Sequence, residues 1–150
     1  MEEIWRNIEG YEGSYEVSNL GRVRSVDRCI VMSDGRKQIK KGKMLAQVKR
    51  RRGQDYLSVG LWKNNRLKSC LVHRLVAKAF IPAIENKEFI NHKDENQENN
   101  CVSNLEWCTA LENVNYGTRN ERATETRRKN IIINTSTEEL LKELKRRKAI

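Results

Sequence analysis

The chain lacks an apolar run long enough to cross a membrane, and its first residues, MEEIWRNIEG, lack the apolar stretch of a signal peptide. We therefore expect a cytoplasmic protein with no membrane attachment. Internal repeats and long low-complexity segments are also missing. The 150 residues, 37% of them hydrophobic, are enough for one compact domain or two small ones around a modest core.

Closely spaced cysteine pairs are missing as well. The four cysteines, Cys29, Cys70, Cys101 and Cys108, include no pair at the CxxC spacing of a zinc knuckle, and the chain has only two histidines. A zinc-stabilised module built on Cys101 and Cys108 is one alternative that these residues leave open. We favour reduced thiols that lie partly in the core.

Acidic residues are outnumbered by basic ones, 20 against 30, which gives a formal net charge of +10. A basic excess of this size favours a polyanionic partner, nucleic acid first and an anionic membrane second. Residues 36–52 carry nine basic side chains and no acidic one, whereas residues 84–113 carry seven carboxylates against two lysines. The second stretch is an acidic island in a basic chain, and it would need a cation before a phosphate backbone could approach it.

The N-terminal half shows the alternation and turn residues of short β-strands. Residues 14–18 alternate between apolar and polar side chains, residues 19–21 predict a turn, and Val23 resumes the alternation. Residues 56–62 and 68–72 predict a second hairpin, whose turn is the sequence Lys-Asn-Asn.

A helix followed by a short strand is predicted after these hairpins. Residues 73–80 place four apolar side chains on one helical face, and Pro82 ends this helix. Phe89-Ile90 is expected to be a short strand.

A capping box predicts the start of a second helix. The Thr109 hydroxyl can accept from the Glu112 amide, while the Glu112 carboxylate reaches back. The helix would carry Asn113 near its first turn and would end at Gly117.

The C-terminal segment predicts a basic tail. Residues 119–130 are polar with no apolar period, and we expect a helix only over residues 136–148, where Ser136 and Glu139 form another capping box. Whether this tail binds a polyanion or is simply solvated stays open. Monomer and weak dimer also stay open, because the apolar stripe is brief: Leu140, Leu141 and Leu144.

An ordered set of motifs over residues 5–115 resembles the HNH homing-type endonucleases of phages and mobile introns. Trp5 and the sequence IEGYEGSYEVSNLGRVRS over residues 8–25 resemble the NUMOD4 module. The nuclease block has its motifs in the family's order: VHRLVA (72–77), AFIP (79–82), NHKD (91–94), NN (99–100), NLEW (104–107), Thr109 and EN (112–113). Each motif alone is weak, but the ordered set is specific.

The resemblance implies an α+β fold with N-terminal antiparallel hairpins, a ββα-metal nuclease core and a C-terminal helix. Three domains follow from it: a β-rich DNA-binding module over residues 1–71, the nuclease over residues 72–120, and a basic helical tail over residues 121–150.

The resemblance also implies roles for four side chains. His92 would be the general base that deprotonates water, which suits its near-neutral pKa. Asn104 would brace the loop by hydrogen bonding to backbone. Asn113 would ligate one divalent cation, with Asn91 as second ligand. Amide oxygens are hard ligands and favour Mg²⁺ or Mn²⁺.

Asn91 raises two questions. Some family members have aspartate at this position, so two neutral ligands here would hold metal weakly until DNA phosphate completes the site. Neighbouring strand residues face opposite sides, so Asn91 and His92 can share a site only if the strand ends or twists there. A non-catalytic DNA-binding protein that keeps the HNH fold is therefore the alternative.

The basic stretch is predicted to contact the phosphates of double-stranded DNA. Its contributing residues are Lys40, Lys41, Lys43, Lys49, Arg50, Arg51 and Arg52. We expect cleavage to leave 5′-phosphate and 3′-hydroxyl ends, in the cytoplasm of a bacterial or phage-infected host cell. The other histidine, His73, is expected to cap or pack its helix rather than to react.

Overall fold

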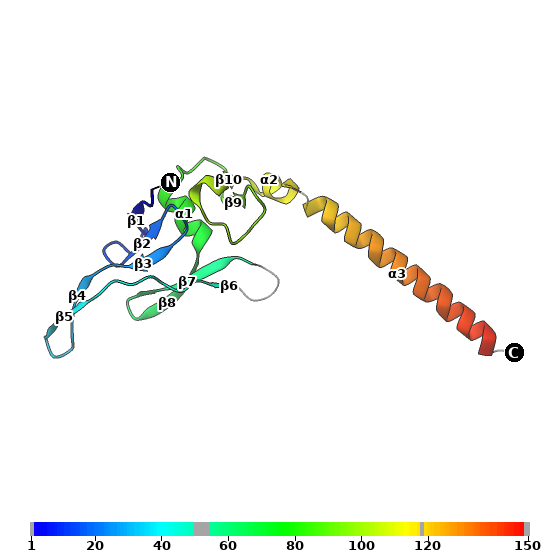
Figure 1. Ribbon diagram of the computed structural model, residues 1–150, viewed down its shortest axis with the longest axis horizontal. Helices are drawn as coiled ribbons and strands as arrows, with labels where there is room; N and C mark the ends of the chain where they lie inside the picture. Colours follow the sequence, from blue (N-terminus) through cyan, green and yellow to red (C-terminus); the bar gives the residue numbers. More distant parts are fainter. Residues whose placement is uncertain (1, 50–54, 118, 149–150) are drawn as a thin grey trace. The chain divides into compact units, whose positions relative to one another are not determined.

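The computed structural model describes residues 2–49, 55–117 and 119–148, and it shows a mixed α+β fold (Figure 1). Its chain divides into two compact units, residues 1–113 and residues 114–150. The first unit contains every strand and the first helix. The predicted fold class is confirmed, with antiparallel hairpins and a C-terminal helix.

The first sheet has the order β1-β2-β3, formed by Trp5–Asn7, Tyr15–Ser18 and Val23–Ser25. The predicted turn between β2 and β3 is present, and Gly21 adopts a φ of +81°, which favours glycine. The Asn19 side chain accepts a hydrogen bond from the Ile4 backbone N–H at 2.8 Å. This turn therefore also fixes the entry of the chain into β1.

Two further hairpins follow in the sequence. The first pairs β4 (Arg28–Val31) with β5 (Lys37–Lys40), and sequence patterning did not predict it. The second confirms the other predicted hairpin and pairs β7 (Leu57–Lys63) with β8 (Arg66–Leu71). Asn64 and Asn65 both have positive φ, at 50° and 57°, as a tight hairpin turn requires. The short strand β6 (Val48–Lys49) adds to the edge of β7.

The nuclease block begins at helix α1 (Val72–Phe80), which ends just before Pro82 as predicted. The chain then forms an antiparallel pair of β9 (Phe89–His92) and β10 (Leu105–Cys108). A 3-10 turn, η1 (Val102–Asn104), leads into β10, and α2 (Ala110–Asn115) follows it. Strand β9 is thus two residues longer than Phe89-Ile90.

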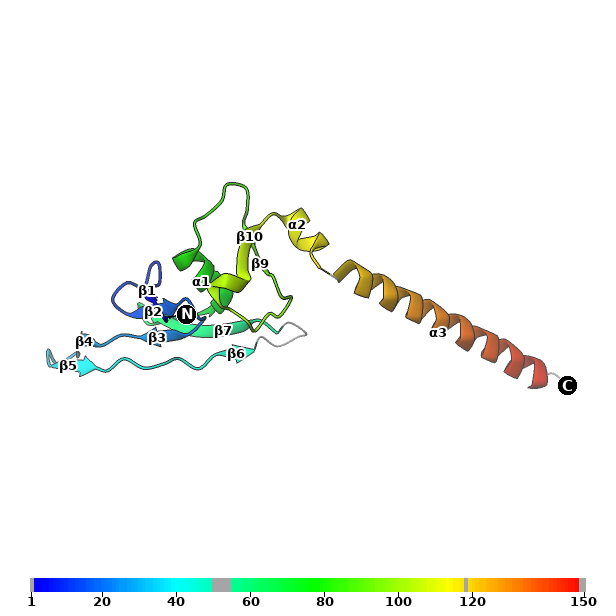
Figure 2. The ribbon, with the colours of Figure 1, turned by 45° about the horizontal axis from the view of Figure 1, so that its top comes forward.

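The N-terminal strands and the nuclease block share one hydrophobic core. Helix α1 contacts strands from both parts, including β2, β7, β9 and β10, and Figures 1 and 2 show it between them. The buried core residues include Val17, Val23, Val59, Leu61, Val72, Val76, Ile90, Leu105 and Trp107. The predicted boundary between residues 71 and 72 therefore lies inside one packed unit.

The C-terminal helix differs from the prediction. Helix α3 spans Arg119–Lys148 without a break, so the predicted start at Ser136 is wrong. Residues 119–130 lack an apolar period but are rich in helix-forming Arg, Glu, Lys and Ala, and Glu125 and Lys129 form an i,i+4 ion pair at 3.6 Å. Propensity and charge pairing, rather than an apolar face, account for this half of the helix. Within the described residues, no helix is both long and apolar enough to span a membrane.

Candidate active site

His92 is the last residue of β9 and is paired with Leu105 of β10. The strand ends there because the chain turns: the Glu95 N–H donates to the His92 carbonyl at 3.0 Å, and the Lys93 N–H donates to the Asn104 carbonyl at 2.9 Å. The imidazole is buried. The histidine is therefore held at the point where the hairpin opens into the loop of residues 93–104.

One hydrogen bond orients the His92 ring. Its Nε2 lies 3.1 Å from the Asn100 Oδ1, and the Asn100 Nδ2 donates to the Glu98 carbonyl at 3.3 Å. Asn100 is itself only 4% exposed, so the hydrogen bond to His92 lies in a buried environment. The NN motif at residues 99–100 belongs to the resemblance, but nothing in the sequence indicated that Asn100 contacts His92, so this contact was missed.

Two more rings pack around His92. The Tyr56 and His73 ring centroids lie 5.9 Å and 5.3 Å from that of His92, and 4.8 Å from each other. His73 therefore packs in the same cluster as His92, and its buried Nδ1 has no hydrogen-bond partner within the described part of the chain. Tyr56 was not identified from the sequence, because nothing in its spacing indicates contact with either histidine.

Burial sets the titration of both imidazoles. It lowers the pKa of His73 to about 3, with the nearby His92 and Arg74 acting in the same direction. Burial also lowers the pKa of His92, and the Asn100 hydrogen bond and the Asp94 charge partly oppose this. His92 is consequently neutral at pH 7 and has a lone pair to accept a proton.

Asn104 connects the two ends of the loop. Its Oδ1 accepts from the Asp94 N–H at 3.1 Å, and its Nδ2 donates to the Asp94 Oδ1 and the Asn99 carbonyl, both at 2.8 Å. Asp94 also accepts from the Asn99 side chain and the Asn96 N–H, and these bonds hold the pKa of its carboxyl below the usual value. The contacts are those of a loop brace, while a catalytic role for Asn104 stays a prediction.

Asn91, the first predicted metal ligand, pairs with Glu106 in the β9–β10 hairpin. It is buried, and its Nδ2 has no hydrogen-bond partner among the residues that the structure describes. The unpartnered atom is the amide nitrogen, which donates hydrogen bonds, whereas a cation would bind the Oδ1 of the same side chain.

Asn113, the other predicted ligand, lies on α2 and is half-buried. The capping box that starts this helix is confirmed: the Thr109 N–H donates to Glu112 Oε2 at 2.8 Å, and the Glu112 N–H donates to Thr109 Oγ1 at 3.2 Å. Lys87 pairs with Glu112 at 3.1 Å and so ties α2 to the segment before β9. Among the described residues, no hydrogen bond joins the Asn113 side chain to His92 or Asn91.

Carboxylate and thiolate clusters do not supply a metal site here. Within the residues that the structure covers, no group of three His, Cys, Asp or Glu side chains could hold a metal ion. Cys101 approaches the Leu20 carbonyl, with its sulfur 3.8 Å from the oxygen, and Cys108 is buried on β10. A cation would therefore depend on amide oxygens and on oxygens that a substrate brings.

The predicted DNA-binding lysines are exposed residues of β5, β6 and the segment between these strands. Lys41 pairs with Asp27 at 2.7 Å. Lys49 pairs with Glu98, which raises the pKa of the lysine and ties β6 to the loop that carries Asn100. Arg50, Arg51 and Arg52 lie outside the described residues.

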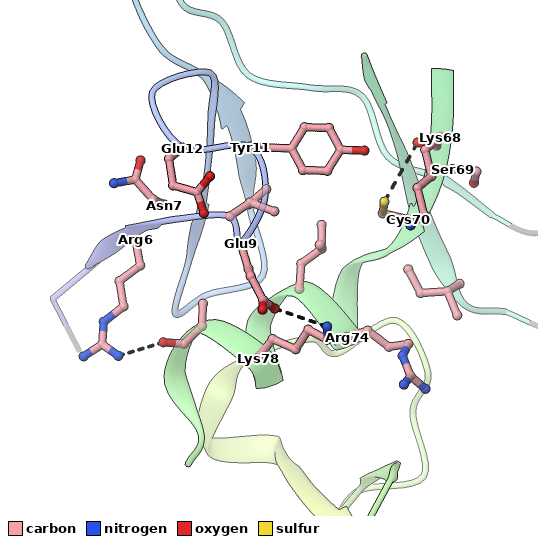
Figure 3. Close-up of a pocket in the computed structure, with 14 residues that line it drawn as sticks. Arg6, Asn7, Glu9, Tyr11, Glu12, Lys68, Ser69, Cys70, Arg74 and Lys78 are labelled. Atoms are coloured by element: carbon pink, nitrogen blue, oxygen red, sulfur yellow. Dashed lines mark hydrogen bonds and ion pairs between the residues drawn. The ribbon is translucent and has the colours of Figure 1, made fainter. Parts of the chain in front are cut away.

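A cavity of about 600 Å³ lies elsewhere in the first unit, between the loop that follows β1 (residues 8–12), β8 and α1 (Figure 3). Its charged groups are partly used within the protein: Lys78 pairs with Glu9 at 3.2 Å, and Arg6 donates to the Ala79 carbonyl at 2.7 Å. None of the four predicted catalytic and metal-binding residues lines it. The cavity is therefore not the predicted reaction site.

Comparisons with known proteins agree with the motifs. Residues 3–62 match the model of the NUMOD4 motif, and residues 70–115 match that of an HNH endonuclease. The fold is similar to that of a solved structure described as DNA binding and cleavage by the HNH homing endonuclease I-HmuI, with a TM-score of 0.62 and 33% identity over 89% of this chain and 68% of that one. The chain belongs to the HNH homing endonuclease family.

Three curated relatives illustrate how this HNH family member compares in length. It is 40% identical over 110 residues to the DNA endonuclease I-HmuI of Bacillus phage SP01, covering 73% of this chain and 55% of the relative. It is 36% identical over 146 residues to the uncharacterized HNH endonuclease L247 of Acanthamoeba polyphaga mimivirus, covering 94% and 32%. It is 57% identical over 44 residues to the putative HNH homing endonuclease YosQ of Bacillus subtilis (strain 168), covering 29% and 25%. The chain thus spans about half or less of their lengths.

Proposed function

We propose that this chain is a metal-dependent DNA endonuclease that hydrolyses phosphodiesters of double-stranded DNA to 5′-phosphate and 3′-hydroxyl ends. The observation that carries the proposal is His92: a buried, neutral imidazole fixed at the end of β9 by a loop that Asn104 braces. The site of action is the cytoplasm of a bacterial or phage-infected cell.

His92 is the general base of this reaction. It accepts a proton from the water that attacks phosphorus, and its lowered pKa keeps it in the proton-accepting form at neutral pH. Asn104 contributes by holding the loop closed, which keeps the imidazole from rotating away from the water.

Asn91 and Asn113 would hold one Mg²⁺ or Mn²⁺. The residues fit such an ion in their chemistry, because both offer neutral, hard amide oxygens. When bound, the ion stabilises negative charge on the phosphate and on the leaving 3′ oxygen. Because both ligands are neutral, we expect isothermal calorimetry to detect no tight stoichiometric Mg²⁺ or Mn²⁺ binding without DNA.

The basic residues from Lys40 to Arg52 bind the DNA backbone. The ion pair of Lys49 with Glu98 supports this assignment, since it places the basic strand beside the loop of the candidate active site. The Gln97 side chain accepts from the Asp55 N–H at 3.0 Å, so the chain contacts the same loop on both sides of Arg50, Arg51 and Arg52 in the sequence. Phosphate contacts of this kind lose affinity steeply with added salt.

Supercoiled plasmid tests the function directly. We expect the wild-type protein to nick it with Mg²⁺ or Mn²⁺ and not with EDTA, and we expect His92→Ala to bind the plasmid without nicking it. Equal nicking by His92→Ala would overturn the role of the histidine.

The second candidate function is a DNA-binding protein without catalysis. The neutral amide of Asn91, where some relatives carry aspartate, is the observation that favours it. It predicts DNA binding by the wild type with no metal-dependent nicking at any Mg²⁺ or Mn²⁺ concentration. Metal analysis of the purified protein, in the same experiment, tests the zinc-stabilised alternative.

A further inference from the structure

The turn between β2 and β3 packs directly against Asn100. A Cβ added to Gly21 would lie 2.8 Å from the Asn100 Cβ and 3.0 Å from its carbonyl oxygen. Two non-bonded carbon atoms do not approach to 2.8 Å, so there is no room for a side chain at residue 21 and the backbone of Gly21 packs directly against Asn100. The N-terminal module therefore reaches the residue that hydrogen-bonds to His92.

Hydrogen bonds fix the same contact on both sides. The Val102 N–H donates to the Asn19 carbonyl at 2.8 Å, which joins the turn to the chain just after Asn100. The Gln47 side chain, from the segment between β5 and β6, donates to the Gly21 carbonyl at 2.7 Å and adds a second anchor to the turn. These two hydrogen bonds hold the Asn19–Gly21 turn in a fixed position against Asn100.

Asn100 determines which imidazole nitrogen of His92 carries the proton. Because its Nδ2 donates to the Glu98 carbonyl, its Oδ1 is the atom that faces the ring. An amide oxygen can only accept, so Nε2 must carry the proton in the neutral imidazole. The lone pair then lies on Nδ1, which is the nitrogen left to take a proton from water.

We propose that Asn100 is a positioning residue that selects the Nε2–H tautomer of His92, and that the Asn19–Gly21 turn of the N-terminal module holds Asn100 in place. The N-terminal module thus completes the nuclease site in addition to contacting DNA. This inference rests on the proposed function for its effect on rate, but the tautomer itself can be measured without activity.

The tautomer is measured by ¹⁵N NMR of the full-length chain labelled at histidine, at neutral pH. The chain has only two histidines, and the set of signals that disappears in His92→Gln belongs to His92. We expect protonated Nε2 and unprotonated Nδ1 in the wild type. A wild-type His92 with its proton on Nδ1 would overturn the proposal, whether or not the protein nicks DNA.

Two isosteric variants of Asn100 separate positioning from packing. Asn100→Leu keeps the volume without the acceptor, and we expect a mixture of tautomers and a fall of about 10- to 100-fold in the single-turnover nicking rate, with the DNA Kd unchanged. Asn100→Asp keeps an acceptor oxygen, and we expect it to retain the proton on Nε2 while its negative charge raises the pKa of His92 and moves the pH profile of nicking to higher pH. Asn7→Leu, an exposed asparagine on β1, is the matched control and should behave as wild type.

Gly21→Ala tests the support by the turn. It adds both a clash with Asn100 and the cost of a positive φ, whereas Gly10→Ala adds a similar cost, at φ +77°, in open space. We expect Gly21→Ala to reproduce the NMR and kinetic changes of Asn100→Leu, and Gly10→Ala to leave both unchanged.

The outcomes are distinguishable. Wild-type protein that shows the Nε2–H tautomer but never nicks DNA would overturn the proposed function and leave the positioning intact. Asn100→Leu that nicks at the wild-type rate, or that keeps a pure Nε2–H tautomer, would overturn the positioning role. Gly21→Ala that keeps the wild-type tautomer and rate would overturn the support by the turn.

Discussion

Asn91 is the residue at which charge at the site can be changed with the least change in shape. Its amide is buried and its Nδ2 has no partner, so a carboxylate of nearly the same volume fits the position. A negative ligand attracts a divalent cation far more strongly than a neutral one, but its burial without a cation is unfavourable.

We therefore expect Asn91→Asp to lower the Mg²⁺ concentration needed for half-maximal nicking by on the order of tenfold. Without metal, the same variant should melt at a lower temperature than wild type, and added Mg²⁺ should reverse this. A Mg²⁺ titration of nicking and of thermal melting measures both effects. Unchanged metal dependence in both assays would contradict the assignment of Asn91 as a ligand, and Asn91→Ala, which should lose nicking, is the control.

His73 couples folding to pH. Its folded pKa of about 3 lies below the ordinary value of 6.5, so the folded state takes up its proton later than the unfolded state as pH falls. Stability from this group is fully present above about pH 6.5 and is lost as pH falls towards 3. At pH 4.5 the loss is about 2–3 kcal/mol.

The measurement is urea unfolding of the wild type and His73→Gln between pH 7 and pH 4.5. We expect the wild type to lose stability more steeply, whatever packing His73→Gln loses at pH 7. Parallel pH profiles for the two proteins would show that His73 is not buried in its neutral form.

His92, Asn91, Asn104 and Asn113 were selected because their motifs stand in the order and spacing of the family that the sequence resembles, and their catalytic and metal-binding roles stay predictions. The contacts of Asn100 and Tyr56 with His92 could not be predicted, since they depend on how the loop of residues 93–104 folds back. No local spacing encodes a hydrogen bond between a strand end and a loop residue eight positions later.

At the scale of elements, local rules succeeded where an element is short and bounded by strong signals. The Thr109–Glu112 capping box and the Asn64-Asn65 turn both have the predicted geometry. The β4–β5 hairpin was missed because its strands are basic and mostly exposed, so no buried alternation marks them. Helix α3 was predicted to start too late because its first half is stabilised by propensity, which an apolar period does not report.

The capping box makes a prediction for α2. This helix has six residues and no buried side chain, so it depends on its cap more than a packed helix does. We expect Thr109→Ala to cost about 1 kcal/mol in helix stability and to reduce nicking at limiting Mg²⁺ by on the order of fivefold.

Glu112→Gln provides the matched comparison. A glutamine keeps the reach-back hydrogen bond and loses only the exposed ion pair with Lys87, so nicking should stay close to wild type. Circular dichroism and plasmid nicking at low Mg²⁺ test the pair. If Thr109→Ala needs the same Mg²⁺ concentration for nicking as the wild type, the assignment of Asn113 as a metal ligand is contradicted.

At the scale of the whole molecule, the chain has a net charge of +10, and residues 36–52 contribute nine basic side chains without an acidic one. All four described lysines are exposed, but Lys41 and Lys49 already pair with carboxylates, whereas no ion pair of Lys40 or Lys43 is found among the described residues. Lys40 and Lys43 should therefore contribute most directly to phosphate binding among these four lysines.

We expect Lys40→Ala and Lys43→Ala each to weaken DNA binding on all sequences and to reduce the slope of log Kd against log salt by about 0.9. Lys78→Ala removes the same charge beside the cavity of Figure 3 and should leave the slope unchanged. Fluorescence anisotropy from low to high salt provides the slopes. Equal effects of all three substitutions would mean that overall charge, rather than this strand, drives binding.

The core shared by the N-terminal strands and α1 bears on how such enzymes can recombine. Val17 and Val23 pack in the same cluster as Val72 and Val76, so a chimaera that joins one relative's first 62 residues to another's nuclease block would pair two surfaces that had not diverged together. A chimaera that keeps residues 1–113 from one protein would keep this core intact, and that unit is longer than either motif match within it.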